Sequence, residues 1–269
     1  MMYAMDRKIE IVFRVGRKAV LPLIVVIVFF LLPYLLIVVG SGIFPVHMHG
    51  VSVPSFTYVD GMQTRKGEPV NIVFVGFDME KDRTFESLGW IPLERLWKEG
   101  AGKALSDLPK GVTPISNRYL SGRLQDLSYQ GSDSGIGHRH HIRLWQEGSG
   151  STLPVYYATA SYDQTVGFMP SWLFFVPTHI IAPNIDSERD LIGNLFEKEF
   201  DADIRYIDGA TPSLLRFNGN NAWYYTDGMV MVVSRTTASD TAGPIFSRLR
   251  RLYFGVITTV LKAFGIATE

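Results

Sequence analysis

No cysteine occurs anywhere in the 269-residue chain. Disulfide bonds, zinc–thiolate sites and cysteine nucleophiles are therefore excluded, and the redox compartment is left undetermined. The sequence also lacks the G-x-S-x-G nucleophile elbow, the H-E-x-x-H zinc helix and the G-x-x-x-x-G-K-[ST] phosphate loop. No motif names a cofactor or a resident metal, so any chemistry has to come from histidine, arginine and carboxylate side chains.

The net charge is zero, but the charges are unevenly distributed. Residues 1–18 carry five basic and two acidic side chains, and residues 245–269 carry four basic and one acidic. The part between them is therefore acidic, which argues against a nucleic-acid surface because such a surface needs clustered Lys and Arg. Basic ends suit anionic lipid headgroups. We expect a membrane lipid, and no nucleic acid, as a partner.

Ala19–Val39 is an uninterrupted run without charge. As a helix it would be about 32 Å long, enough to cross a bilayer, with a kink at Pro33. Five basic residues precede the run and the next charged residue is Asp60, so the N-terminus is predicted to be cytoplasmic and the rest extracytoplasmic. A cleaved signal peptide is the alternative, although its apolar core spans only about 7–15 residues. The pattern predicts a single-pass membrane protein.

The rest of the sequence predicts an α+β fold with a mixed, largely antiparallel sheet and packed helices. Helical spacing covers Asp82–Trp97, and a second helix begins near Asp186, with Asp186 or Ser187 as its cap. Asp227-Gly228 predicts a hairpin with a type I′ turn. Apolar runs and alternation indicate the strands, which are expected at Val70–Gly76, Gly122–Tyr129, Gly137–Trp145, Pro154–Tyr162, Ala202–Ile207 and Trp223–Val233.

The C-terminal segment carries an apolar stripe at 3.6-residue spacing from Ile245 to Phe264. It predicts an amphipathic helix that lies on a membrane or in a protein groove, with a second membrane span as the alternative. Near the other end, His47 and His49 flank Met48 and form a weak candidate for a metal site. The expected organisation is a cytoplasmic basic segment, a transmembrane helix, a connector, a soluble domain, and a linker with the amphipathic helix, at 1–18, 19–39, 40–66, 67–236 and 237–269.

The stretch Gly137–Trp145 holds three of the six histidines. Side chains on a strand alternate between its faces, so His138, His140, Ile142 and Leu144 share one face. Ile142 and Leu144 mark that face as the core side. The other face would then expose Arg139, His141, Arg143 and Trp145, and His141 would be more accessible than His140. An exposed row of Arg and His attracts anions.

Further polar residues stand at the ends of the neighbouring segments. We expect His140 or His141 to act with Asp163 and His179 as catalytic groups, and a concave patch to gather them with the ligand-binding residues Arg139, Arg143, Asp186 and Arg189. Histidines and carboxylates could hold a divalent metal that activates water. Alternatively, the arginines could clamp a phosphate while a histidine transfers a proton. The structural alternative makes Asp186 a helix cap and pairs Arg189 with Asp126 or Asp163.

Four stretches, from Gly67 to Phe200, resemble the LssY C-terminal type of domain. They are Asn71–Gly76 before Gly89-Trp90, Pro114 to Asp126, Arg139-His140-His141 with Arg143-Leu144-Trp145, and Asp163 with His179 and Asp186 to Asp190. The domain often follows a multi-span lipid-phosphatase-type module in that family, and its own activity is not established. This chain has one expected span and no phosphatase motif. The resemblance therefore implies a membrane-lipid context and no particular reaction.

Two functions remain open from the sequence. The first is a membrane-anchored extracytoplasmic domain that binds an anionic, phosphate-bearing lipid, envelope ligand or partner through its Arg/His surface. The second is a metal- or histidine-dependent hydrolase that acts on a phosphorylated membrane lipid or envelope substrate. A membrane-protein partner fits either function, and the sequence leaves the oligomeric state undetermined.

Overall fold

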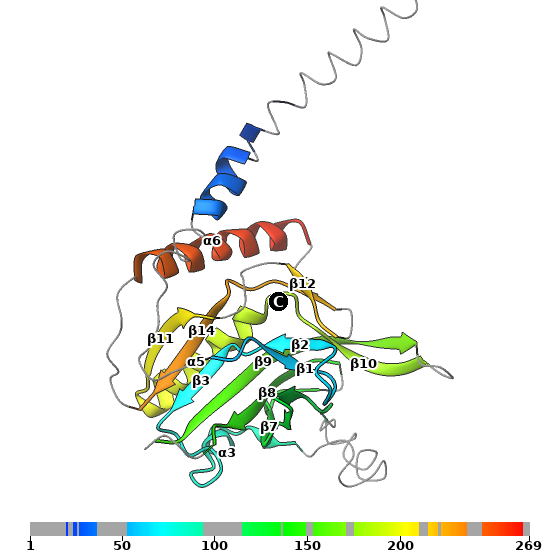
Figure 1. Ribbon diagram of the computed structural model, residues 1–269, viewed down its shortest axis with the longest axis vertical. Helices are drawn as coiled ribbons and strands as arrows, with labels where there is room; N and C mark the ends of the chain where they lie inside the picture. The colour runs from blue at the N-terminus through cyan, green and yellow to red at the C-terminus, as the bar shows by residue number, and fades with distance from the viewer. Residues whose placement is uncertain are drawn as a thin grey trace, which may run out of the picture.

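The computed structural model describes residues 20, 24–25, 27–36, 53–93, 115–135, 137–148, 153–170, 175–209, 215–219, 222–235 and 244–265. They form the expected α+β fold, with mixed, mostly antiparallel sheets and few helices (Figure 1). The large sheet has eight strands in the order β11-β14-β3-β9-β8-β7-β4, and β10 pairs with β9. Its strands are β3 (Ile72–Val75), β4 (Ile91–Pro92), β7 (Leu127–Gln130), β8 (Arg139–Gln146), β9 (Val155–Pro170), β10 (Phe175–Ile181), β11 (Asp203–Asp208) and β14 (Met229–Ser234).

Smaller elements cover this sheet. A four-stranded sheet contains β2 (Lys66–Pro69), β1 (Phe56–Tyr58), β5 (Tyr119–Leu120) and β6 (Arg123–Leu124), and β12 (Arg216–Phe217) pairs with β13 (Trp223–Tyr224). The helical elements are the π-helix Ile27–Leu31, α3 (Thr84–Ser87), α5 (Ile185–Phe200) and α6 (Pro244–Ala263).

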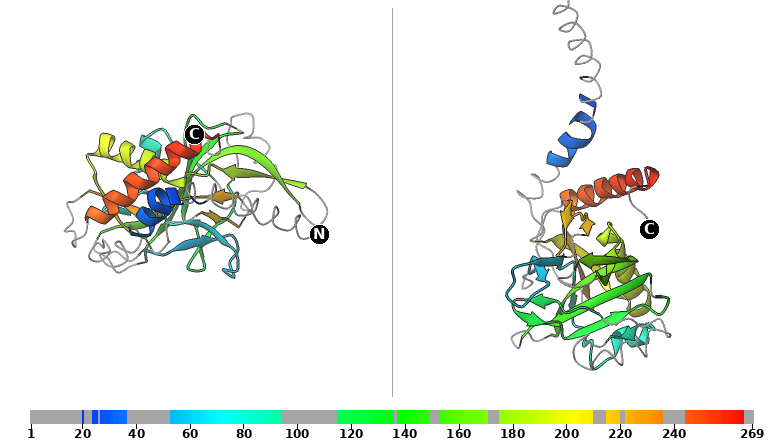
Figure 2. Two further views of the ribbon diagram at one scale, coloured as in Figure 1. Left: turned by 90° about the horizontal axis from the view of Figure 1, so that it is seen from above. Right: turned by 90° about the vertical axis from the view of Figure 1, so that its right-hand side faces the viewer.

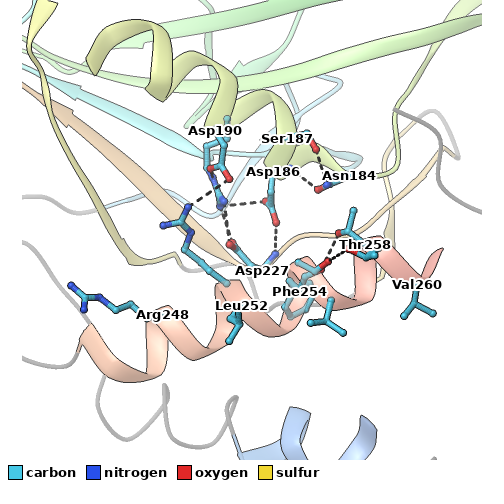
Figure 3. A pocket seen from close by; sticks show the side chains of 15 residues that line it. Asn184, Asp186, Ser187, Asp190, Asp227, Arg248, Leu252, Phe254, Thr258 and Val260 are labelled. Atoms are coloured by element: carbon cyan, nitrogen blue, oxygen red, sulfur yellow. Dashed lines mark hydrogen bonds and ion pairs between the residues drawn. The ribbon is translucent and has the colours of Figure 1, made fainter. Parts of the chain in front are cut away.

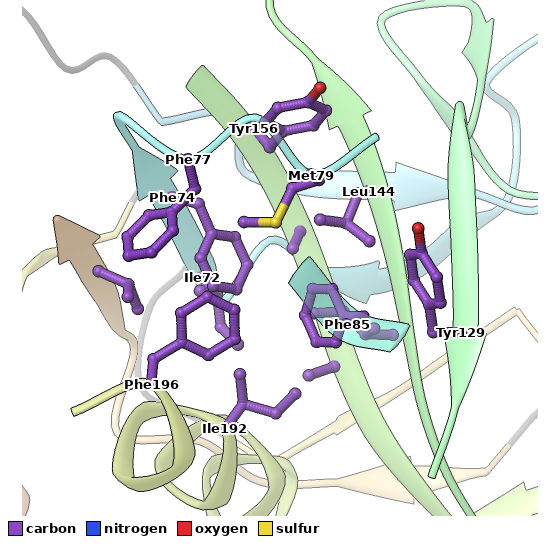
Figure 4. Packing of buried hydrophobic residues seen from close by; sticks show 14 of the residues in the cluster. Ile72, Phe74, Phe77, Met79, Phe85, Tyr129, Leu144, Tyr156, Ile192 and Phe196 are labelled. Atoms are coloured by element: carbon purple, nitrogen blue, oxygen red, sulfur yellow. The ribbon is translucent and has the colours of Figure 1, made fainter. Parts of the chain in front are cut away.

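One face of the large sheet, here called the α5 face, carries the main core. Residues that are paired across β3, β8 and β9 share this face because strand register keeps their side chains on one side. Phe196 of α5 packs on Phe74 with ring centroids 4.8 Å apart, and Phe85 lies 5.4 Å from Phe196 (Figure 4). Aromatic rings in these tilted and edge arrangements hold α5 against the sheet.

The opposite face, here called the small-sheet face, is also buried. Val73, Trp145 and Tyr157 form a second apolar cluster there with Leu120 of β5. Trp145 donates a hydrogen bond from Nε1 to the carbonyl of Arg123, at the start of β6, over 3.2 Å. The four-stranded sheet therefore lies over β8, and both faces of this strand are covered.

This covering overturns the expected exposure of the Arg/His row. Arg139, His141 and Arg143 are at most 3% exposed, whereas the His140 side chain on the α5 face keeps 25% of its surface. The alternation of side chains was predicted correctly. The accessibility of the row and the ranking of His141 over His140 were wrong, because a sheet that is distant in sequence buries the row.

Three local predictions also need correction. The strand expected at Gly122–Tyr129 is divided between β6 and β7, which belong to different sheets. The helix expected from Asp82 is only α3, because Gly89 turns the chain with φ +80° and Pro92 lies in β4. Residues 94–97 lie outside the described ranges. Helix α5 begins after Asn184, whose side chain accepts a hydrogen bond from the Asp186 backbone N–H, so Asn184 is the cap.

The hairpin predicted at Asp227-Gly228 does not form. β14 pairs with β11 and β3, whereas Trp223 and Tyr224 pair with β12. A type I′ turn needs positive φ at both central residues, and only Gly228, with φ +72°, has it. Strands β7 and β8, in contrast, are consecutive in the chain and pair antiparallel.

Helix α6 lies crosswise between the domain and the helical segment that contains Ile27–Leu31 (Figures 1 and 2). Within the described residues, no helix combines the length and apolarity that a membrane span requires. The predicted span Ala19–Val39 is described only in part, and residues 37–50 and 236–243, which include His47 and His49, lie outside the description.

Candidate functional site: a buried arginine–histidine cluster

Three neighbouring strands bring five of the predicted site residues together on the small-sheet face. β8 supplies Arg139, His141 and Arg143, β9 supplies Asp163, and β10 supplies His179. Register places Arg139 opposite Asp163, and β10 shifts register between Ile180 and Ile181, next to Asp163. We call these five residues the Arg/His cluster.

Asp163 is the centre of the cluster. Its Oδ2 accepts hydrogen bonds from Nε and Nη2 of Arg139 over 3.1 and 2.8 Å. Nδ1 of His141 lies 3.4 Å from the same oxygen, and Nδ1 of His179 lies 3.7 Å from it. Burial opposes ionisation, but His141, Arg139 and His179 together hold the pKa of Asp163 below its usual value. Asp163 is therefore a carboxylate surrounded by donors.

The tautomer of His141 follows from its neighbours. Nη1 of Arg143 lies 3.0 Å from Nε2, and Oγ of Ser161 lies 3.1 Å from it. A guanidinium only donates, so Nε2 accepts and the ring proton sits on Nδ1, facing Asp163. Burial is the largest cause of a pKa well below the usual value, and the three nearby arginines add to it against Asp163. His141 is thus a neutral imidazole.

Arg143 and Arg118 extend the network towards the small sheet. Arg118 forms an ion pair with Glu68, with Nε 3.0 Å from Oε2. Arg143 contacts only neutral groups: His141, and the carbonyl and hydroxyl oxygens of Ser116 at 3.4 and 3.3 Å. Across the described ranges, no carboxylate forms an ion pair with Arg143. Burial, and then repulsion from Arg118, lowers the pKa of Arg143 to about 9, so it remains a cation at neutral pH.

Charges in this interior do not balance. Three buried arginines, at 118, 139 and 143, face two buried carboxylates, Glu68 and Asp163. One positive charge is therefore in excess at neutral pH. Several buried polar atoms around the cluster also have no hydrogen-bond partner among the described residues: Nδ1 of His141, Nδ1 of His179, Oγ1 of Thr159 and Oδ1 of Asn117. Buried atoms of this kind each cost about 1–3 kcal/mol and gather at functional sites.

The order Ser161–His141–Asp163 is that of a nucleophile, a base and an orienting acid. Ser161 and its two partners are nevertheless buried, and Arg143 donates to the same ring nitrogen that would have to accept the serine proton. The arrangement holds charge in place and does not present a nucleophile.

His140 belongs to a separate pair on the α5 face. Its Nδ1 lies 2.7 Å from Oε2 of the buried Glu188, and its Nε2 lies 3.9 Å from Asp133. Burial opposes the charged imidazole, but Glu188 and then Asp133 outweigh it and raise the pKa of His140. A partly exposed imidazole that a buried carboxylate orients is suited to proton transfer.

Asp186 and Arg189 form a third group at the start of α5. Arg189 donates to both carboxylate oxygens of Asp227 over 2.7 and 3.1 Å, and to Asp190 over 2.9 Å. Asp186 lies 3.3 Å from Arg189 and accepts hydrogen bonds from Thr226 and the Asp227 backbone. Burial raises the pKa of Asp186 to about 7. The expected pairing of Arg189 with Asp126 or Asp163 is therefore wrong.

This third group lines a pocket of about 750 Å³ between the start of α5 and helix α6 (Figure 3). Its α6 wall carries Arg248, Arg251 and Leu252. The predicted residues thus lie in three places: the Arg/His cluster, the His140–Glu188 pair and this pocket. Within the described part of the chain, no three histidine, aspartate or glutamate side chains are placed to hold a metal ion.

The sequence did not point to three residues of these networks, namely Glu68, Arg118 and Asp227. Glu68 and Arg118 are 50 positions apart and meet only because β2 and β5 join one sheet through β1. Asp227 was interpreted as a turn residue because Gly228 follows it in the sequence. Neither spacing nor composition marks these positions, because each acts through a partner that the fold supplies.

A family model described as the LssY C-terminus matches residues 52–230. The chain belongs to this family. The match covers more than half of the 269 residues and includes the Arg/His cluster, the His140–Glu188 pair and Asp227, whereas α6 lies beyond it. Comparisons with curated proteins and with solved structures each found no match.

Proposed function

We propose that this LssY C-terminal domain binds a phosphate-bearing ligand, a membrane lipid or an envelope molecule, at the Arg/His cluster. The observation that carries the proposal is the excess positive charge beside Arg143, which among the described residues has only neutral hydrogen-bond partners. A buried cation without a carboxylate is costly, and an anion in contact with it offsets that cost. Phosphate suits the site because guanidinium groups bind its oxygens in pairs.

The neighbouring donors favour the same ligand. Nδ1 of His179 and Oγ1 of Thr159 have no partner in the described structure, and each can offer a proton to a phosphate oxygen. The side chain of His179 keeps 22% of its surface exposed, which makes it the member of the cluster that solvent reaches. We infer that the ligand approaches the cluster from the side of His179.

The proposal includes attachment to a membrane. We infer that Ala19–Val39 is a single span, with a cytoplasmic N-terminus and an extracytoplasmic domain. The uncharged run and the five basic residues before it support this topology. So do the exposed apolar side chains of its described part, which include Ile24, Leu32 and Leu36. The ligand would then be drawn from the lipids or the envelope on the outer side.

A histidine-dependent hydrolase is the second candidate, and the His140–Glu188 pair is the observation that favours it. Glu188 is buried and fixes the orientation of the partly exposed imidazole across 2.7 Å. Such a pair can donate or accept a proton at a phosphate ester. Release of phosphate from a lipid phosphate by the wild-type chain, lost in His140→Gln, would support this candidate over binding alone.

The binding proposal is tested by calorimetric titration of the full chain in detergent micelles with inorganic phosphate and with glycerol 3-phosphate. We expect the wild type to bind and Arg143→Gln to bind at least about tenfold more weakly, since a charged hydrogen bond contributes about 1.5–3 kcal/mol. Arg83→Gln, at an exposed site just before α3, is the matched control and should bind like the wild type.

If Arg143→Gln fails to fold, His179→Gln serves as the second variant because its side chain is partly exposed. Stronger binding of glycerol 3-phosphate than of inorganic phosphate would indicate a lipid headgroup as the source. The proposal is contradicted by a wild type that binds neither compound, or by folded cluster variants that bind both as the wild type does.

A further inference from the structure

Helix α6 has two different sides. Arg250 and Phe254 are buried against the domain, where Phe254 packs with Tyr225. The other side carries an exposed row in which Leu252 is 68% and Phe264 is 76% exposed. Spacing of three and four residues makes one continuous apolar stripe along the helix, formed by Leu249, Leu252, Val256, Val260 and Phe264.

This stripe continues into a second apolar surface. The ring of Tyr34 lies 6.0 Å from that of Tyr253 and 6.3 Å from that of Phe254, so the N-terminal helical segment rests on α6. Leu32 and Leu36 of that segment are exposed. Figures 1 and 2 agree that the segment rises from α6 on the side away from the domain. The two apolar surfaces therefore belong to the same end of the molecule.

The side chains at this junction are those that a membrane interface selects. Trp223, Tyr225, Tyr253 and Tyr34 gather in one cluster with Phe254. Tryptophan and tyrosine are enriched where a bilayer meets water, because their rings are apolar and their tips are polar. Arg248 near one end of α6 and Lys262 near the other are exposed cations, which match anionic headgroups.

We propose that α6 lies in the headgroup layer of a bilayer that contains anionic lipids, with its exposed stripe dipping into the acyl boundary. Helices of this kind sink about 5–10 Å into that boundary and run parallel to the membrane plane. The inference rests on the proposed membrane attachment and adds a second contact to it. Two contacts fix the orientation of the domain, with α3 at its far end, and bring the pocket beside α6 to headgroup level (Figure 1).

The absence of cysteine allows a direct test. Single cysteines at Leu252, Val256 and Phe264 are spin-labelled in the full chain, which is reconstituted into vesicles of phosphatidylcholine and phosphatidylglycerol. Power-saturation EPR with oxygen and with a water-soluble nickel complex then reports the surroundings of each label. We expect the three labels to favour oxygen and a label at exposed Met62 to favour nickel.

A label at Leu32 separates this inference from the membrane anchor. Oxygen preference at Leu32 together with nickel preference along the α6 stripe would overturn the position of α6 and leave the anchor intact. Nickel preference at Leu32 would overturn the anchor itself. Labels on α6 that neither reagent reaches, or that broaden each other's spectra, would show that a protein surface or a second copy covers the stripe, and this also overturns the inference.

Discussion

Arg143 donates a hydrogen bond to Nε2 of His141 over 3.0 Å inside the domain. Because a guanidinium has no acceptor, this contact makes the imidazole neutral and directs its proton towards Asp163. Arg143 therefore stays a cation beside a neutral ring, and His141 does not share the charge of the cluster. This relationship makes Arg143 the residue on which an anion would be held.

Glu68 should make the folded domain sensitive to acid. Burial opposes its ionisation, but Arg118 and Arg143 lower the pKa of Glu68 from 4.5 to about 2. The stabilisation is present above pH 4.5 and is lost as pH falls towards 2, and its size is on the order of 3 kcal/mol. Denaturant titrations of the wild type and Glu68→Gln should differ most at neutral pH and converge in acid. A difference that stays constant with pH would contradict the pairing.

Arg189 should be essential for stability. It is 1% exposed, and its donors go to Asp227, Asp190 and the carbonyl oxygen of Met229. Arg189→Ala leaves buried carboxylates without a cation, which costs about 3–5 kcal/mol of the free energy of unfolding. Arg83→Ala, at an exposed position, should cost less than about 0.5 kcal/mol. Equal losses in the two variants would show that the buried network adds little stability.

The pKa of His140 should depend on Glu188. Burial of the ring lowers this pKa, and the hydrogen bond and charge of Glu188 raise it above the usual value. The charged imidazole therefore contributes stability below pH 6.5 that is lost as pH rises through the raised pKa of His140, and in acid the pair is lost again because burial also raises the pKa of Glu188. We expect Glu188→Gln to lower the His140 pKa in an NMR titration of the imidazole proton. An unchanged titration would indicate that the two groups do not interact in solution.

Topology can be measured at the turn between β1 and β2. Met62 is exposed there, and the chain has no other thiol once Met62→Cys is introduced. A membrane-impermeant maleimide added to intact cells should label this cysteine if the domain is extracytoplasmic. Labelling only after the membrane is permeabilised would reverse the proposed orientation.

Local sequence patterns predicted the strands that are buried on both faces and the helix α5. Ile72–Val75 and Met229–Ser234 are apolar runs whose burial needs no special partner, and they lie beside each other inside the sheet, with neighbours on both sides. The α+β class is confirmed for the same reason. The hairpin at Asp227 failed because the carboxylate that suits a turn is instead bound by Arg189, from a helix that starts about 40 residues earlier.

The grouping of Arg139, His141, Asp163 and His179 followed from alternation and from the order of neighbouring strands. Their burial did not, because the sheet that covers them is built from segments near Glu68 and Arg118. Alternation assigns side chains to faces, but long-range packing decides which face meets water. Asp186 and Arg189 do not join this cluster, because the start of α5 faces helix α6 and lines the pocket between them.

A crystal structure of the full chain soaked with tungstate, a phosphate analogue with a strong anomalous signal, tests the anion site most directly. We predict an anomalous peak within hydrogen-bonding distance of Arg143, with His179 on its outer side. Arg143→Gln crystals should lack that peak. Peaks confined to the protein surface, with the Arg143–His141 contact unchanged, would contradict the assignment of the cluster as an anion site.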